Sequence, residues 1–337
     1  MRQTRLLPGK LPLPLLERLL NKYTSKKDGV IIGPGIGIDA TVIKTTGDYL
    51  IAKTDPITFV AEDIGLYAII INANDIAAMG GRPRWFLANI LLPEKKTTYA
   101  LVENVFSQLS KACKELSISF CGGHTEVTLG INRPIIIGQM LGEINKDDLI
   151  TAGGAKAGDN IILTKGIAIE ATSIIAREKE KMLLKRFSKR FIKRCKETIK
   201  NPGLSIYKEA IIVRKLGKVH AMHDPTEGGI ATGLHELAIA SGVGLLINKE
   251  SIPVLQECKI LCDYFGIDPM GVIASGALII AVDQKDTENV IKGLRIKGID
   301  ASHIGNVTHK RKGIKIIEKG KIKRLSLFER DEITKVL

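Results

Sequence analysis

Two short glycine-rich stretches carry polar side chains that could bind a polyphosphate. The first is Cys121-Gly-Gly-His-Thr-Glu126, and the second is His223-Asp-Pro-Thr-Glu-Gly-Gly229. Each follows an apolar, strand-like stretch, and we expect a turn at each Gly-Gly pair. Glycine permits positive φ and a close approach of a ligand, and several N–H groups of such a turn can face one anion. The pair of turns therefore indicates a site for a phosphate-rich ligand.

Three aspartates stand at the ends of expected elements. Asp39 follows a glycine loop, Asp55 ends a strand, and Asp75 lies on one side of the next helix. One such aspartate alone is usually a cap or a turn residue, but three in this order, followed by the Gly-Gly pairs, favour a shared site. Mg²⁺ binds a few carboxylates together with water and phosphate oxygens, so these three residues are candidate metal ligands.

The elements between these residues predict an α/β (α+β) protein of two domains. Apolar periodicity predicts helices over 11–23, 63–79, 98–116, 206–216, 228–241 and 287–298, and one basic amphipathic helix in 177–200. Strands are expected over 41–43, 49–53, 84–92, 118–121, 134–142, 160–164, 245–248, 277–282 and 303–307. The glycine-rich segment 151–158 marks a boundary between domains 1–155 and 156–337. Strands and helices alternate in the second domain, as in an α/β layer.

The net charge of +14 is concentrated in two segments. Residues 177–200 hold 11 basic and 3 acidic side chains, and residues 310–324 hold 8 basic and 1 acidic, which leaves the rest of the chain close to neutral. Solvated lysine-rich faces are the simplest interpretation, and a phosphate-rich partner is the alternative. Because aromatic residues make up only 4% and the body is nearly neutral, we do not expect nucleic acid as a partner.

The five cysteines form no CxxC pair and no zinc-site spacing. Cys258 and Cys262 lie one helical turn apart, which packing explains. Residues 1–10 lack the apolar core of a signal peptide, and no 18-residue apolar run indicates a membrane span. We expect a cytoplasmic protein with reduced thiols and no membrane contact.

Several short motifs occur in the order seen in a known family. They are Gly37-Ile-Asp-Ala-Thr-Val42, Lys53-Thr-Asp55, Asn74-Asp-Ile-Ala-Ala-Met-Gly80, Gly122-Gly-His-Thr125 and Asp224-Pro-Thr-Glu-Gly-Gly229. Together they resemble the PurM-like superfamily, which contains aminoimidazole ribonucleotide (AIR) synthase, thiamine-monophosphate kinase, selenophosphate synthetase and the hydrogenase-maturation protein HypE. The stretch Gly233-Leu-His-Glu-Leu-Ala238 is most similar to HypE and its unassigned relatives.

The resemblance implies a two-domain PurM-like fold with ATP and Mg²⁺ in a cleft between the domains. It implies a homodimer, because the strands of the N-terminal domain would pair with those of a second copy around a shared β-barrel. The residues it assigns to the nucleotide and its phosphates are Gly37, Asp39, Asp55, Asp75, Gly122, Gly123, Thr125, Asp224, Gly228 and Gly229. Asp39, Asp55 and Asp75 would also be ligands of the metal.

The chain departs from the family pattern at four positions. Ile38 replaces the first aspartate of Gly-Asp-Asp-Ala, Glu126 stands where HypE has lysine, Glu227 replaces an arginine, and Ser275 occupies the place of a catalytic glutamate. The sequence also ends at Leu337 without the terminal cysteine that accepts the carbamoyl group in HypE. We therefore expect that the HypE dehydration does not run here in the same way.

His124 and Glu126 are the candidate catalytic residues. A histidine at a nucleotide site can move protons near neutral pH, or it can simply hydrogen-bond the turn. His220 and His223 lie beside the second glycine motif. The sequence predicts that their segment is extended, so we do not expect the two side chains to bind one metal ion together.

The resulting expectation is an ATP- and Mg²⁺-dependent enzyme that phosphorylates or activates an oxygen of a small acceptor that the sequence does not identify. Such catalysis consists mainly of positioning and charge neutralisation. The alternative is a catalytically degenerate nucleotide-binding regulatory protein or an accessory protein of hydrogenase maturation. The departures favour this alternative, and the retained aspartates disfavour it. A nucleic-acid-associated protein is a third, weaker interpretation.

Overall fold

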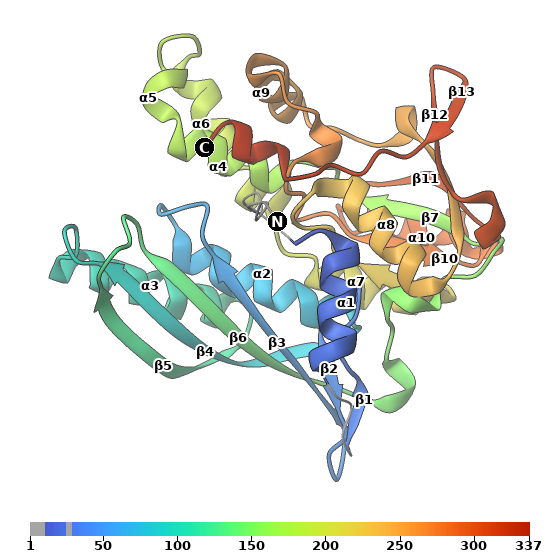
Figure 1. The fold of residues 1–337 in the computed structure, drawn as a ribbon, viewed down its shortest axis with the longest axis horizontal. Coiled ribbons are helices and arrows are strands. Elements are labelled where there is room, and N and C mark those ends of the chain that lie inside the picture. The colour runs from blue at the N-terminus through green and yellow to red at the C-terminus, as the bar shows by residue number, and fades with distance from the viewer. Residues whose placement is uncertain (1–10, 25–28) are drawn as a thin grey trace, which may run out of the picture.

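The first half of the chain is built on a six-stranded sheet (Figure 1). The computed structural model describes residues 11–24 and 29–337, so the interpretation of residues 1–10 lies outside the described residues. The strands lie in the order β1-β2-β3-β6-β4-β5, and only the pair β4–β5 is parallel. Their bounds are β1 Val30–Ile32, β2 Thr41–Ile43, β3 Tyr49–Ile57, β4 Arg82–Pro93, β5 Ser119–Thr128 and β6 Ile135–Ile144.

Two helices cover one face of this sheet and leave the other without a described helix (Figure 1). They are α2 Ile64–Ala78 and α3 Tyr99–Glu115, while α1 Leu13–Tyr23 lies at the β1–β2 end. Almost every residue of α2 is buried, which is the expected state of a helix that is apolar all round. Because α2 packs between the first sheet and the second half of the chain, it can place polar side chains at the junction between them.

The second half forms a seven-stranded sheet in the order β13-β12-β9-β11-β7-β10-β8. Only β12 and β9 are parallel, so the sheet is largely antiparallel although strands and helices alternate along the chain. The strands are β7 Asn160–Thr164, β8 Val219–His223, β9 Gly244–Asn248, β10 Ile279–Val282, β11 Ala301–Thr308, β12 Ile314–Glu318 and β13 Lys321–Arg324. The helices are α4 Ile169–Glu178, α5 Glu180–Leu183, α6 Lys189–Glu197, α7 Tyr207–Leu216, α8 Gly229–Ser241, α9 Gln256–Phe265 and α10 Thr287–Ile296.

The predicted α/β (α+β) fold class is confirmed by two sheets with their helices, and two local predictions are wrong. Gly122 and Gly123 do not form a turn: they lie inside β5, at a bulge in its pairing with β4. A bulge accepts one extra residue with positive φ and lets the strand continue, and a sequence pattern does not distinguish it from a turn. Residues 177–200 form several short helices, because the Ser188 hydroxyl accepts a hydrogen bond from the Phe191 N–H and caps a new helix there.

Buried polar contacts connect the two halves along α2. Asn74 donates to the Leu204 carbonyl at 2.9 Å and accepts from the Ile206 N–H at 3.0 Å. Both contacts are fully buried, and an unpaired amide there would cost about 1–3 kcal/mol. The segment 204–206 is therefore held in a fixed place against the middle of α2.

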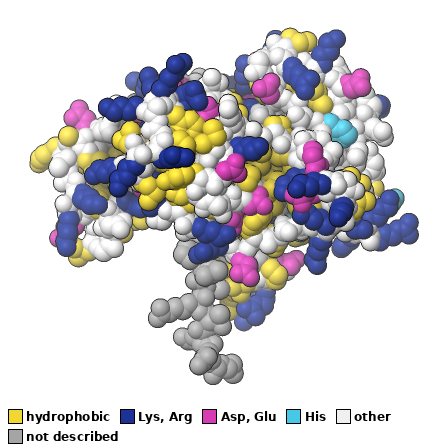
Figure 2. Space-filling view, turned by 90° about the horizontal axis from the view of Figure 1, so that it is seen from above, with side chains coloured by type: hydrophobic (Ala, Val, Ile, Leu, Met, Phe, Trp, Pro, Cys, Tyr) yellow, Lys and Arg dark blue, Asp and Glu magenta, His cyan; other side chains and the backbone are white. Residues whose placement is uncertain are grey.

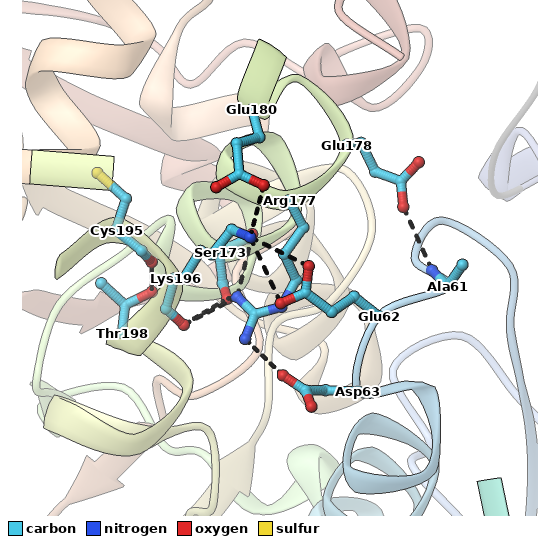
Figure 3. A network of polar contacts seen from close by, with 10 residues as sticks. All are labelled: Ala61, Glu62, Asp63, Ser173, Arg177, Glu178, Glu180, Cys195, Lys196 and Thr198. Atoms are coloured by element: carbon cyan, nitrogen blue, oxygen red, sulfur yellow. Dashed lines mark hydrogen bonds and ion pairs between the residues drawn. The ribbon is translucent and has the colours of Figure 1, made fainter. Parts of the chain in front are cut away.

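A second set of contacts connects the beginning of α2 with α4 and α6 (Figure 3). The buried Arg177 guanidinium donates to Asp63 at 2.6 Å, and Lys196 lies 3.1 Å from Glu62 and 3.0 Å from Glu180. Arg177 also donates to the Lys196 carbonyl at 2.9 Å. The beginning and the middle of α2 are thus fixed to the second half of the chain, which fixes the geometry of any site between α2 and that half.

Basic side chains spread over much of the surface, with acidic groups between them (Figure 2). In the segment 177–200 some of them pair within the chain, such as Arg194 with Glu257 at 3.0 Å. These pairs agree with the interpretation of the basic segment as a solvated face. Across residues 11–24 and 29–337, no helix is both long and apolar enough to cross a bilayer.

Candidate active site

Three buried aspartates from distant parts of the chain meet between the two halves. Asp39 comes from the loop before β2, Asp75 from α2 and Asp224 from the residue after β8, and they are 6%, 3% and 2% exposed. One oxygen of Asp39, one of Asp75 and both of Asp224 have no hydrogen-bond partner among the described residues. Buried carboxylate oxygens of this kind are costly unless a cation or a donor binds them.

The electrostatics of this cluster show that its charges act on one another. Burial raises the pKa of the Asp75 carboxyl to about 8; the Lys53 ammonium opposes this rise, and the Asp55 and Asp39 carboxylates add to it. Burial also raises the pKa of Asp224 well above its ordinary value, and the Asp75 and Asp39 charges add to that shift. The cluster therefore carries more negative charge than the surrounding protein compensates.

Lys53 is one of the cations that the protein itself supplies to the cluster. Its ammonium lies 3.0 Å from Asp75 and 3.7 Å from Asp55. Burial alone would lower the pKa of Lys53, but the Asp75 and Asp55 carboxylates outweigh it and raise the pKa. Lys53 thus stays charged and holds Asp55 and Asp75 close to each other.

His223 holds Asp39 in place. Its Nδ1 donates to Asp39 at 2.6 Å and its Nε2 to Glu236 at 3.1 Å, and all three side chains are buried. Burial by itself would lower the pKa of His223, but Asp39 and Glu236 outweigh it and raise the pKa to about 10. Because both ring nitrogens are engaged, His223 is a positioning residue rather than a metal ligand, although its ring lies within 4.8 Å of ligand atoms of Asp39 and Asp224.

Gly37 allows the loop that carries Asp39 to reach α8. Its φ is 71°, and a Cβ at this position would come within 2.5 Å of the Glu236 carbonyl oxygen. Only glycine fits such a close backbone approach without strain. Gly37 therefore acts on the site through the position of Asp39.

The residues of the cluster fit a divalent cation with oxygen ligands. Mg²⁺ requires a small number of carboxylates and leaves room for water and phosphate oxygens. Asp39, Asp75 and Asp224 offer the unpartnered oxygens that such an ion would use, and Asp55 adjoins them through Lys53. Asp224, which the resemblance assigns to the nucleotide, is thus placed with the predicted metal ligands.

A second group of acidic side chains lies beside Asp55. Glu170, at the start of α4, is 4% exposed, and it shares the wall of a small pocket with Asp55, Glu227 and Ser275. Burial raises the pKa of Glu170 to about 8; the Ser275 hydroxyl opposes the rise, and the Glu227 carboxylate is among the charges that add to it. Ser275 stands where the family pattern has a glutamate, so Glu170 supplies a carboxyl next to that position.

The second glycine motif is partly occupied by the chain itself. Gly228 and Gly229 form the predicted turn, and α8 begins there. The Gly228 N–H donates to the Asp331 carboxylate at 2.7 Å. A carboxylate at a helix N-terminus takes the place that an anionic ligand would use. Gly229 packs against residues 270–272.

The first glycine motif, residues 121–126, lies far from the aspartate cluster of the same chain. Strand register pairs Asp55 with Gly138, Gly138 with Ala88, and Ala88 with Gly123, so Gly123 is three strand spacings, about 14 Å, from Asp55. A Cβ on Gly123 would lie 2.0 Å from the Ala88 carbonyl oxygen, so this glycine is needed for strand pairing.

His124 and Glu126 point to the sheet face opposite the aspartate cluster. His124 is in register with the exposed Asn89, whereas the neighbouring Ala88 and Ile90 are buried under the helices. His124 lies 3.3 Å from Glu126. The Thr128 hydroxyl and then His124 lower the pKa of Glu126. Thr125 is exposed on the same edge strand. The structure does not bring these residues to the cluster of its own chain, and their roles stay predictions.

Comparisons with known proteins place the chain in a family. The description "AIR synthase related protein, N-terminal domain" matches residues 37–144, and the corresponding C-terminal domain matches residues 156–318. A putative hydrogenase expression/formation protein of Methanocaldococcus jannaschii is 30% identical over 85% of this chain and 85% of its own length. The carbamoyl dehydratase HypE of Escherichia coli K12 is 26% identical over 83% and 82%.

Solved structures show the same fold. A hydrogenase maturation protein HypE in complex with ATP has a TM-score of 0.72 at 23% identity and covers 99% of this chain and 100% of its own. The thiamine monophosphate kinase of Aquifex aeolicus has a TM-score of 0.70 at 21% identity and covers 93% and 98%. Fold and site define a PurM-like two-domain protein. The chain belongs to the AIR synthase-related family, with HypE-type hydrogenase-maturation proteins among its relatives, as the motifs predicted.

Proposed function

We propose that the protein binds ATP with Mg²⁺ at the aspartate cluster and activates an oxygen of a small acceptor by phosphoryl transfer. The observation that carries the proposal is the set of unpartnered buried oxygens on Asp39, Asp75 and Asp224. Relatives support the nucleotide, since a protein of the same fold was solved in complex with ATP. The domain division at residues 155/156 is part of the proposal and would place the cluster between the two domains.

The side chains of the site would act mainly by position and charge. Asp39, Asp75 and Asp224 would hold Mg²⁺, which neutralises phosphate charge when it is bound. Lys53 keeps the carboxylates of Asp75 and Asp55 together. His223 fixes the orientation of Asp39 from the other half of the chain. The site is therefore preorganised before any ligand arrives.

A nucleotide-binding regulatory protein, or an accessory protein of hydrogenase maturation, is the second candidate. Two observations favour it: His124 and Glu126 face away from the cluster, and the Gly228 amide is already bound by Asp331. Such a protein would bind ATP and Mg²⁺ without turning the nucleotide over.

A homodimer and a cytoplasmic place of action belong to the proposal. The face of the first sheet without a helix carries apolar side chains such as Leu87, Leu91, Ile137 and Leu141, which are only half-buried in one chain. A second copy that pairs with this sheet would cover them. Light scattering is expected to give twice the chain mass of 36.7 kDa, and a monomer at every accessible concentration would refute the dimer.

ADP formation tests the enzymatic part of the proposal. The protein with ATP and Mg²⁺ is screened against a panel of small metabolites, and one class of acceptor is expected to stimulate ADP release. Asp55→Asn should reduce that rate on the order of 100-fold, because it removes a charge that Lys53 holds beside the proposed Mg²⁺ site. Glu103→Gln, on the exposed side of α3, is the control and should leave the rate unchanged. ATP binding without stimulation by any acceptor would favour the regulatory candidate.

A further inference from the structure

The small pocket beside Asp55 has acidic, hydroxyl-bearing and apolar walls and no basic one. Asp55, Glu170 and Glu227 supply the carboxylates, and Ile57, Ile71 and Ile174 supply aliphatic surface. Among the described residues that line it there is no lysine, arginine or histidine. Its volume is about 20 Å³, which is room for one particle of the size of a water molecule.

Two buried oxygens in this pocket, Glu170 Oε2 and Ser275 Oγ, lack a hydrogen-bond partner among the described residues. Glu170 is 4% exposed, and its Oε2 makes no hydrogen bond to any described residue. A buried carboxylate oxygen without a donor is costly. An anionic ligand is excluded because it would face three carboxylates, and a neutral apolar group would leave Glu170 unpaired. The pocket therefore requires a small hydrogen-bond donor, and its three carboxylates favour a cation over a neutral water molecule.

We propose that this pocket binds a primary ammonium group, either free ammonium or the amino end of the acceptor. The inference rests on the proposed function, since Asp55 belongs to both the pocket and the aspartate cluster. An ammonium group is about as large as water and has three or more N–H donors for Glu170, Glu227 and Asp55. The isoleucine walls suit an aliphatic stem better than a bare metal ion, which prefers oxygen on all sides.

The charge around the pocket fits this ligand. Glu227 shares the pocket wall with the buried Glu170, and its carboxylate acts on Glu170. Two acidic side chains so close together attract a cation and repel an anion. The acceptor of the proposed phosphoryl transfer is accordingly an amine-bearing or ammonium-dependent substrate.

Binding of simple cations tests the inference at pH 8 and constant ionic strength. Ammonium, methylammonium, tetramethylammonium and potassium chlorides are titrated, and the thermal unfolding midpoint is followed. Ammonium or methylammonium should raise the midpoint saturably, and the other two should not. Tighter binding of methylammonium would identify an organic amine as the source, and tighter binding of ammonium would identify the free ion.

Variants assign the effect to the pocket. Glu170→Gln and Glu227→Gln should each weaken ammonium binding at least about tenfold, since each removes a charged acceptor, while Glu103→Gln should not change it. Equal binding of potassium, no saturable effect, or unchanged affinity in both pocket variants would overturn the inference. Calorimetry with Mg²⁺ and ATP on the same samples distinguishes a failure of the ammonium site from a failure of the proposed function. Nucleotide binding without ammonium binding would refute only the ammonium site. Ammonium binding without nucleotide binding would refute only the proposed function.

Discussion

Asp224→Asn is expected to raise the stability of the ligand-free protein while it weakens the binding of ATP with Mg²⁺. At pH 8 we expect an increase of about 1–3 kcal/mol in the free energy of unfolding, because burial and repulsion by Asp75 and Asp39 outweigh the attraction of the charged form of Asp224 to His223 and Lys53. The same substitution should weaken nucleotide affinity on the order of 100-fold, since it deletes a charged ligand. Denaturant unfolding and calorimetry measure the two effects.

Asp159→Asn is the matched control. Asp159 is also buried, but it accepts hydrogen bonds from the Lys156 N–H at 2.8 Å and from His220 at 2.9 Å. Its substitution should therefore cost about 1–2 kcal/mol of stability and leave nucleotide affinity unchanged. If Asp224→Asn destabilises the protein as Asp159→Asn does, Asp224 has a structural role and the account of the cluster fails.

The ligand-free protein should lose stability as the pH rises from 5 to 8. Glu170 and Asp75 have pKa values of about 8 in the folded protein, above their ordinary values. Between the unfolded and folded pKa values the folded state binds more protons, so stability falls with pH by up to about 1.4 kcal/mol per pH unit for each group. His223, with a pKa raised to about 10, acts in the same direction above pH 6.5.

Unfolding in denaturant at fixed pH values measures this slope. Glu170→Gln removes one of the titrating groups and should make the slope of stability against pH shallower. Mg²⁺ with ATP should also reduce the loss of stability at higher pH, because the ion takes the place of the proton at Asp75. Stability that rises between pH 5 and 8 would show that the buried carboxyls keep ordinary pKa values. Carboxyls whose pKa is lowered, such as Glu318 with about 2, titrate below this window.

The sequence predicts the elements and the main acidic residues, because both depend on local pattern. Helix 63–79 is evident from its apolar period, and Asp39, Asp55 and Asp75 from their places at element ends. The structure adds how they meet: α2 places Asp75 against Lys53, and the turn after β8 brings Asp224 to the same cluster. Asp224 lies more than a hundred positions from Asp39 and Asp75 along the chain, and no local pattern specifies that the three residues meet.

Three functional residues were missed for physical reasons. Lys53 stands in a quoted motif, but its pairing with Asp75 depends on how β3 packs on α2. His223 adjoins Asp224, and that position was the available signal for a role at the cluster. Glu170 has no motif around it and acquires its significance only from burial beside Ser275. The glycine pair at 122–123 has a turn-like composition, and only strand pairing shows that it is a bulge.

The most direct measurement is anomalous diffraction from crystals of the protein grown with Mn²⁺ and a non-hydrolysable ATP analogue. The account predicts one manganese peak between the carboxylates of Asp39, Asp75 and Asp224, with the phosphates of the analogue bound to the same ion. A nucleotide bound elsewhere, with no manganese peak at these three aspartates, would contradict it.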